Sequence, residues 1–188
     1  MFGLSLTDHL RLTFGHVIYS HRAHATTAAQ HARWDRWLKT GEVLLMMGTA
    51  IAAVALVFTL NPAHAVATAI MASAAALTMI VRIALDFEHT SSTHRSCSAR
   101  LWHIREQYRA VLSDLQDGVL TVEGARDRRD ALMASLHHIY EDAPPSDRET
   151  YQSARQSLAR LDEAVLSDEE IDQFLPPSLQ KAGRSAPT

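Results

Sequence analysis

An uncharged stretch of 39 residues, from Val43 to Val81, dominates the pattern of hydrophobic and polar positions in this chain. Asn61 and Pro62 divide the stretch into two apolar runs, and an Asn-Pro pair is typical of a turn. At the rise of an α-helix, about 20 residues cross the hydrocarbon core of a bilayer. The pattern therefore predicts a transmembrane hairpin over residues 41–85, with spans at about 43–60 and 65–85.

Two other interpretations of the apolar stretch are weaker. A signal peptide has a single apolar core near its N-terminus, whereas this stretch begins at residue 43 and contains two runs. A buried hairpin of a soluble domain would not need so long an uncharged stretch. The second run is rich in alanine, and small residues let helix backbones approach closely in lipid. This favours helix–helix packing over a single anchor.

Basic and tryptophan residues flank the open end of the hairpin, whereas the turn at residues 61–64 has no Asp, Glu, Lys or Arg. Basic residues mark the cytoplasmic side of a membrane protein, and tryptophan favours the interface. We therefore expect a multi-pass protein of a bacterial inner membrane with both termini in the cytoplasm. The flanking residues are Arg33, Trp34, Arg36, Trp37, Lys39 and Arg82.

The rest of the chain has helical periodicity. Residues 1–40 predict an N-terminal cytoplasmic helix that enters the first span as one long or gently broken helix. Residues 86–178 predict a helical cytoplasmic domain, whose first helix continues from the membrane to Gly118. The apolar positions of the N-terminal helix are Leu10, Phe14, Val17 and Ile18, and those before Gly118 are Leu101, Ile104, Tyr108, Val111, Leu112 and Leu115.

Helix-capping signals divide the C-terminal half. Thr121 is a suitable N-cap for a helix to Tyr140, and Ser146 begins a capping-box motif for a helix to about Val165. Ser167 begins a second capping-box motif before a short helix. Residues 179–188 are expected to form a disordered tail. With no strand alternation, the fold class is an all-α, oligomeric membrane protein whose long hairpin helices extend into a helical domain.

Charge and composition exclude several functions. Residues 1–99 carry a net charge of +2 and residues 100–188 a net charge of −5, which argues against general affinity for duplex DNA or anionic lipid and leaves open only a local basic patch. The single Cys97 excludes an intramolecular disulfide. No glycine-rich phosphate loop, nucleophile motif or paired-carboxylate motif is present. We therefore expect no enzyme, no catalytic residues, no cofactor and no metal site.

Four polar segments resemble the SLATT family, bacterial two-transmembrane proteins found beside nucleotide-sensing and nucleotidyltransferase modules. The longest is the segment Leu-Trp-His-Ile-Arg-Glu-Gln-Tyr-Arg at 101–109, which continues to Gly118. Together with the hairpin, the resemblance covers about residues 1–178. The other segments are 128–132, 139–144 and 168–176.

The resemblance implies a pore-forming effector of antiphage defence. Such a protein is expected to form a homotetramer in the bilayer and to permeabilise the membrane. The gating signal would be a nucleotide or oligonucleotide second messenger made by a partner nucleotidyltransferase. Two helices cannot enclose a pore, so conduction requires several copies. The alternative is a non-conducting, membrane-anchored interaction or scaffold protein with a helical partner-binding domain.

Polar residues in and beside the spans are candidates for the pore and its mouth. Thr49 and Thr59 share a helical face, but each hydroxyl could instead bond its own helix. In an oligomer, ionisable residues at the membrane edge would form rings that set ion selectivity. Arg82 and Asp86 could also pair along one helix, and an apolar constriction is a further alternative. The mouth candidates are Glu42, Arg82, Asp86 and Glu88, and the apolar ones are Leu45, Ile51 and Phe58.

Two clusters combine arginines with aromatic residues, as an anionic nucleotide site requires. The first contains Arg105, Tyr108 and Arg109. Acidic neighbours such as Glu106 and Asp130 leave a solvated, salt-bridged face as the alternative. The second cluster is Arg126, Arg128 and Arg129, followed by His137, His138 and Tyr140.

The chain has eleven histidines. A zinc site needs ligands that converge from two segments, and no such set is evident. Packing at a helix seam and pH sensing both remain open for the N-terminal histidines. Those that recur at intervals of seven or eight are His9, His16, His24 and His31.

Overall fold

The computed structural model describes residues 5–144 and 167–181, and every regular element in those ranges is a helix. This confirms the all-helical class predicted from the sequence. The helix predicted from Ser146 to about Val165 lies outside the described residues. The chain divides into two compact units. We call residues 27–92 the hairpin unit, and residues 1–26 with 93–188 the helical unit.

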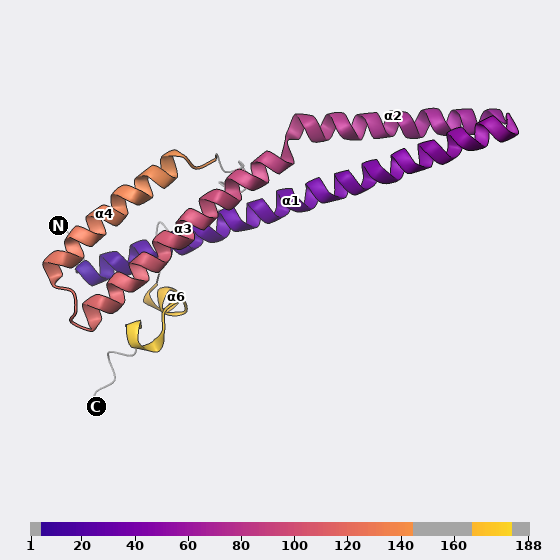
Figure 1. Ribbon diagram of the computed structural model, residues 1–188. Coiled ribbons are helices and arrows are strands. Elements are labelled where there is room, and N and C mark those ends of the chain that lie inside the picture. The colour runs from indigo at the N-terminus through magenta and orange to yellow at the C-terminus, as the bar shows by residue number, and fades with distance from the viewer. Residues whose placement is uncertain (1–4, 145–166, 182–188) are drawn as a thin grey trace. The chain divides into compact units, whose positions relative to one another are not determined.

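A single helix, α1 (Leu6–Thr59), runs for 54 residues through the N-terminal region and the first apolar run (Figure 1). Ser5 begins it, since the Ser5 hydroxyl accepts a hydrogen bond from the Asp8 backbone N–H at 3.1 Å. No proline interrupts the sequence before Pro62. Of the two predicted forms, one long helix is therefore confirmed.

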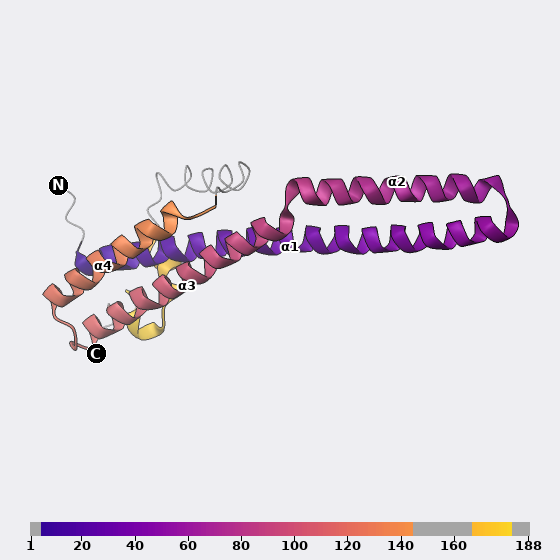
Figure 2. The same ribbon diagram turned by 45° about the horizontal axis from the view of Figure 1, so that its top comes forward.

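The turn of the hairpin uses the residues that the sequence singled out. Leu60 takes a positive φ of 49° after α1 ends. The Asn61 side chain then caps α2 (Pro62–Leu85) by accepting from the Ala63 backbone N–H at 2.9 Å. Pro62 occupies the first turn, where a missing N–H has no cost. Figure 2 shows α2 returning alongside α1 after this turn.

The helix predicted from the membrane to Gly118 is interrupted at Asp86, so that prediction is wrong there. Asp86 adopts a left-handed conformation (φ 39°, ψ 51°) between α2 and α3 (Phe87–Gln116). Aspartate tolerates this region because its short side chain can bond locally. The Asp86 carboxylate accepts from the His89 backbone N–H at 3.3 Å, as an N-cap does. Asp86 therefore ends one helix and begins the next.

The end of α3 is a Schellman motif built on Gly118. Gly118 has a φ of 69°, the left-handed conformation that glycine adopts without steric cost. The Val119 N–H donates to the Asp114 carbonyl at 3.0 Å, and the Gly118 N–H to the Leu115 carbonyl at 3.4 Å. The position of Gly118 in the apolar pattern thus correctly predicted the end of the helix.

Both capping predictions that fall within the described residues are confirmed. Thr121 caps α4 (Val122–Glu141) by accepting from the Gly124 N–H at 3.1 Å. Ser167 and Glu170 form a complete capping box at the start of α6 (Asp168–Asp172). A short 3-10 helix, η1 (Pro177–Leu179), follows.

The core of the helical unit joins the apolar faces of α1, α3 and α4. The predicted positions Leu10, Phe14, Val17 and Ile18 are all buried. They cluster with the apolar side chains of α3, α4 and the C-terminal segment. The other members are Cys97, Leu101, Ile104, Tyr108, Val111, Leu112, Ala125, Leu132, Leu136, Ile139, Ile171, Leu175 and Leu179.

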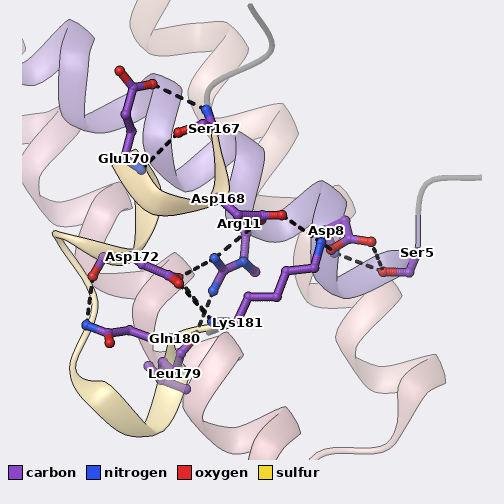
Figure 3. A network of polar contacts seen from close by, with 10 residues as sticks. All are labelled: Ser5, Asp8, Arg11, Ser167, Asp168, Glu170, Asp172, Leu179, Gln180 and Lys181. Atoms are coloured by element: carbon purple, nitrogen blue, oxygen red, sulfur yellow. Dashed lines mark hydrogen bonds and ion pairs between the residues drawn. The ribbon is translucent and has the colours of Figure 1, made fainter. Parts of the chain in front are cut away.

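A buried arginine ties the C-terminal segment to α1 (Figure 3). Arg11 is 1% exposed and donates to the Asp172 carboxylate at 2.5 Å and to the Leu179 carbonyl at 2.7 Å. The Lys181 backbone N–H donates to both oxygens of Asp172 at 3.1 Å. Residues 179–181, which the sequence predicted as the start of a disordered tail, take part in this packing.

Candidate functional site

The apolar surface of the hairpin unit faces outward. The most apolar 18-residue windows of Leu6–Thr59 and Pro62–Gln116 have mean hydropathies of 2.1 and 1.9, with 11% and 6% of each window buried. A core helix of a soluble protein would be mostly buried instead. Among the described residues, α1 and α2 are therefore long and apolar enough to cross a membrane. Exposed large side chains include Leu44, Met47, Ile51, Val54, Val57, Phe58, Val66, Ile70, Leu77, Ile80 and Ile83.

Four threonine hydroxyl groups inside the spans bond their own helices. Thr49 donates to the Leu45 carbonyl at 2.7 Å, and Thr59 to the Ala55 carbonyl at 2.7 Å. Thr68 and Thr78 make the same bond four residues back along α2. Bonds of this kind to the helix's own backbone are the alternative that the sequence left open for Thr49 and Thr59. Only the oxygen lone pairs remain available to water or an ion.

An ion pair joins the two helices of the hairpin at its open end. The Glu42 carboxylate accepts from Arg82 Nε at 3.2 Å, and Glu42 is 8% exposed. The Arg82–Asp86 pair considered from the sequence is absent from the described residues. It requires one continuous helix, whereas α2 ends at Leu85 and Asp86 turns to cap α3.

A second group of charges lies on the polar side of this pair. Lys39 Nζ contacts Asp35 at 2.8 Å and Glu88 at 2.9 Å. The pKa of the Lys39 ammonium is raised, mainly by its hydrogen bond to Asp35 and next by its hydrogen bond to Glu88. Three of the four mouth candidates, Glu42, Arg82 and Glu88, are therefore paired within one hairpin. The fourth, Asp86, forms no ion pair with the described residues.

In the helical unit, the first predicted ligand cluster separates into exposed and buried parts. Arg105 donates to Glu106 at 2.9 and 2.6 Å, and Arg109 pairs with the same carboxylate. Tyr108 lies in the core with no exposed surface, so in this conformation its ring cannot stack on a base. Burial raises the pKa of Tyr108 to about 12. The exposed aromatic beside these arginines is Trp102, whose ring lies 5.9 Å from the Arg105 guanidinium.

The second cluster lies along α4. Arg129 pairs with Asp130 at 2.7 Å, whereas Arg126 and Arg128 are exposed and have no ion-pair partner within residues 5–144 and 167–181. The histidines that follow, His137 and His138, both contact Glu141 at 3.3 Å. Tyr140 does not join the arginines, because its hydroxyl bonds the Ser20 hydroxyl at 2.9 Å.

Histidines of α1 and α3 meet in the helical unit. His24 Nδ1 lies 2.8 Å from His94 Nδ1, and His21 Nδ1 lies 2.9 Å from the Ser98 carbonyl. A contact between two ring nitrogens requires one donor and one acceptor, so at least one ring is neutral. Burial lowers the pKa values of His24 and His16. No group of three or more metal-ligating side chains occurs among the described residues.

A pocket of about 270 Å³ lies between α3 and α4. Its two charged residues, Arg100 and Asp142, pair with each other at 3.0 Å. Burial raises the pKa of the Cys97 thiol that lines it, which keeps the thiol protonated. The remaining lining residues are Thr93, Ser96 and Ile139.

Two important side chains were not selected from the sequence. Arg11 lies four residues after Thr7 and three before Phe14, on the apolar face of α1, and a charge on such a face signals a buried partner. Trp102 follows the buried Leu101, and its position outside the apolar periodicity indicates exposure. The sequence therefore contained a signal for each side chain. It could not identify the partners of Arg11, because they come from a segment more than 150 residues away.

Comparison with known proteins assigns the family. The model of the SMODS and SLOG-associating 2TM effector domain family 4 matches residues 6–170. Neither the curated proteins nor the solved structures include a match. The match spans both apolar runs and most of the helical unit, and its name describes an effector domain with two transmembrane segments. The chain therefore belongs to the SMODS and SLOG-associating 2TM effector domain family, as the resemblance of its polar segments indicated.

Proposed function

We propose that this protein is a membrane effector that forms an oligomeric, ion-conducting pore in antiphage defence. The observation that carries the proposal is a hairpin of two apolar helices whose side chains face outward, in a chain of a two-transmembrane effector family. The pore opens or closes in response to a nucleotide or oligonucleotide made by a partner nucleotidyltransferase. Permeabilisation of the bacterial inner membrane then stops the infected cell.

The number of helices requires assembly. One hairpin cannot enclose water, so the conducting unit contains several copies, and we propose a homotetramer. The apolar surface that each copy exposes is divided between lipid and neighbouring copies. Thr49 and Thr59 face the pore through their hydroxyl oxygen atoms, since their protons are bonded to α1.

Asp86 is the best candidate for a selectivity ring. The charges of Glu42 and Arg82 largely cancel at a distance, and Glu88 shares the Lys39 ammonium with Asp35. The carboxylate of Asp86 contacts only a backbone N–H of α3 and has no cation paired with it among the described residues. In an oligomer, these carboxylates form a ring of like charge at the mouth, which favours cations.

The signal binds to arginines on the surface of the helical unit. On α3, Arg105 and Arg109 stand beside Trp102, whose ring offers a surface on which a base can stack. On α4, Arg126 and Arg128 are free of carboxylates among the described residues, and Arg129 follows them. We propose that either the arginines of α3 or those of α4 contact the phosphate groups of the nucleotide signal.

Planar-bilayer recordings of the purified protein, with and without the nucleotide product of the partner enzyme, test the proposal. We expect discrete conductance that responds to this product, and a particle of several copies in detergent. Silence under both conditions, together with a monomeric particle, would overturn the pore and favour the scaffold. In a salt gradient, Asp86→Asn should shift the reversal potential. Asp117→Asn, which removes an exposed acid beyond α3, serves as the control.

A further inference from the structure

The cations beside the first span fall into two classes. Lys39 and Arg82 are satisfied within the hairpin unit by Asp35, Glu88 and Glu42. In contrast, Arg33 and Arg36 are exposed and have no ion-pair partner among the described residues. Arg36 donates from Nε to the Ala32 carbonyl of its own helix, at 3.2 Å, which leaves its charge uncompensated. Two guanidinium groups are therefore available to an external anion.

These arginines share an outward face of α1 with aromatic and apolar side chains. Arg33, Arg36, Trp37, Thr40 and Leu44 follow a helical spacing of three and four, and all but Thr40 have long side chains. Trp37 is 73% exposed and Leu44 is 61% exposed. On the adjoining face, Trp34 is 62% exposed. The face changes from cationic to aromatic to apolar along one helix.

This order of cationic, aromatic and apolar side chains matches the order of the layers of a bilayer, from the headgroups to the hydrocarbon core. Arg36 precedes Val43 by seven residues, which corresponds to about 10 Å along the helix axis. The headgroup region adds about 5–8 Å to each side of the hydrocarbon core, so an arginine side chain at this height reaches it. Tryptophan also favours that depth.

From this arrangement we propose that Arg33 and Arg36, with Trp34 and Trp37, form a binding site for the headgroups of anionic phospholipids. A guanidinium group binds a phosphate through two parallel N–H donors, and its charge matches a lipid with a net negative headgroup. The inference rests on the membrane placement of the hairpin. It adds a lipid preference that is independent of pore formation and of the nucleotide signal.

Tryptophan fluorescence tests the site in the full chain. The protein has three tryptophans, so Trp102→Phe leaves Trp34 and Trp37 as the emitters. This variant is reconstituted in phosphatidylcholine vesicles that contain a minor fraction of brominated phosphatidylglycerol or brominated phosphatidylcholine. The ratio of quenching constants measures the preference for the anionic headgroup near the two tryptophans.

We expect a preference for phosphatidylglycerol of up to about 30-fold at low salt, or about fivefold for each arginine. Arg33→Gln with Arg36→Gln should remove most of it, and raised salt should weaken it. Arg126→Gln with Arg128→Gln, two exposed arginines of α4, should leave it unchanged. Equal quenching by the two lipids, or an unaltered preference in the Arg33/Arg36 variant, would overturn the proposal.

Two controls distinguish a headgroup site from a site for a free phosphate compound and from a failure of membrane insertion. If millimolar glycerol phosphate abolished the preference, the site would bind a free phosphate compound, which would overturn the lipid assignment. If the protein failed to insert into any vesicle, the membrane placement itself, and with it the proposed function, would fail. Insertion without a lipid preference would reject the headgroup site alone.

Discussion

At the scale of single residues, the surroundings of a charge decide its role. Arg11 and Arg33 are both helical arginines in a polar N-terminal region. Arg11 is 1% exposed and its two terminal nitrogens donate to Asp172 and Leu179, whereas Arg33 faces outward without an ion-pair partner among the described residues. Burial of a guanidinium group is tolerated when its charge is paired and most of its donors are bonded. Arg11 therefore acts in folding, and Arg33 is available for binding.

The first prediction concerns Arg11. Arg11→Ala removes the cation from the mostly buried Asp172 carboxylate, and we expect the free energy of opening of residues 167–181 to fall by about 3 kcal/mol. Hydrogen–deuterium exchange of this segment in detergent measures the change. Lys181→Ala removes an exposed cation that pairs with Asp8 and Asp168, and it should have little effect. Equal exchange in the two variants would contradict the role of Arg11.

The second prediction concerns pH. Burial lowers the pKa of His24 in the folded chain below its ordinary value of 6.5, so the unfolded state binds the proton more strongly. The resulting stability is fully present above about pH 6.5 and is lost as the pH falls toward the lower, folded pKa. His16 contributes in the same direction. The melting temperature should therefore fall on acidification from pH 8 to pH 5.

Two variants test whether His24 causes this dependence of the melting temperature on pH. His24→Gln should flatten the fall in melting temperature, because glutamine does not titrate. His103→Gln changes an exposed histidine that contacts Gln107 at the surface of α3, and it should keep the wild-type profile. A profile that stays steep in His24→Gln would assign the dependence to other groups.

At the scale of elements, local chemistry set most helix ends. Thr121 and Ser167 cap the helices that they were predicted to cap, and Asn61, predicted only as part of a turn, caps α2. An N-cap needs only a side-chain oxygen and the next three backbone N–H groups. The break at Asp86 is different. Nothing in the polar sequence after Leu85 forbids a helix, and the aspartate signals a cap only once its backbone is left-handed.

The third prediction tests the pairing of α1 with α2. Arg82→Gln leaves the Glu42 carboxylate, 8% exposed, without its cation and should destabilise the hairpin by about 2–3 kcal/mol. The double variant Glu42→Gln with Arg82→Gln removes both charges and should recover most of the loss. The melting temperature of the detergent-solubilised protein measures both. A double variant no more stable than Arg82→Gln would mean that the two charges are not coupled.

At the scale of the whole molecule, the hairpin unit and the helical unit differ in where their apolar side chains lie. The helical unit buries its apolar side chains in one core built from four segments of the chain. The hairpin unit cannot do so, because two helices cover only a narrow strip of each other. Its exposed apolar surface needs lipid or further copies as its partner.

The fourth prediction concerns membrane topology. Alkaline phosphatase inserted between Asn61 and Pro62 should be active in a bacterial host, because we expect the uncharged turn on the outer side of the membrane. Green fluorescent protein fused after Thr188 should fluoresce, which requires the cytoplasm. An active phosphatase after Thr188 would reverse the orientation. The double variant Arg33→Gln with Arg36→Gln should weaken the bias, since these residues supply part of the basic flank.

Much of the fold follows from the order of residues along the chain. The uncharged run, the Asn-Pro turn, the helical periodicity and the capping motifs are local, and each acts within a few residues. They were sufficient to predict the hairpin, the resemblance to the family and the described long helices, apart from the break at Asp86. The candidate arginines of α3 and α4 could also be chosen in this way, because each cluster lies within one short stretch of the sequence.

Contacts between distant residues depended on the packing of the helices. Burial of Tyr108 in the core, the capture of Arg11 by Asp172 and the pairing of Glu42 with Arg82 each join side chains that have no relation in the sequence. Whether a charge is neutralised or free is a property of what packs against it, and a one-dimensional pattern does not contain that information. For this reason the folded chain distinguishes Asp86, Arg33 and Arg36, which are free of ion pairs among the described residues, from the neighbouring charges that hold the hairpin together.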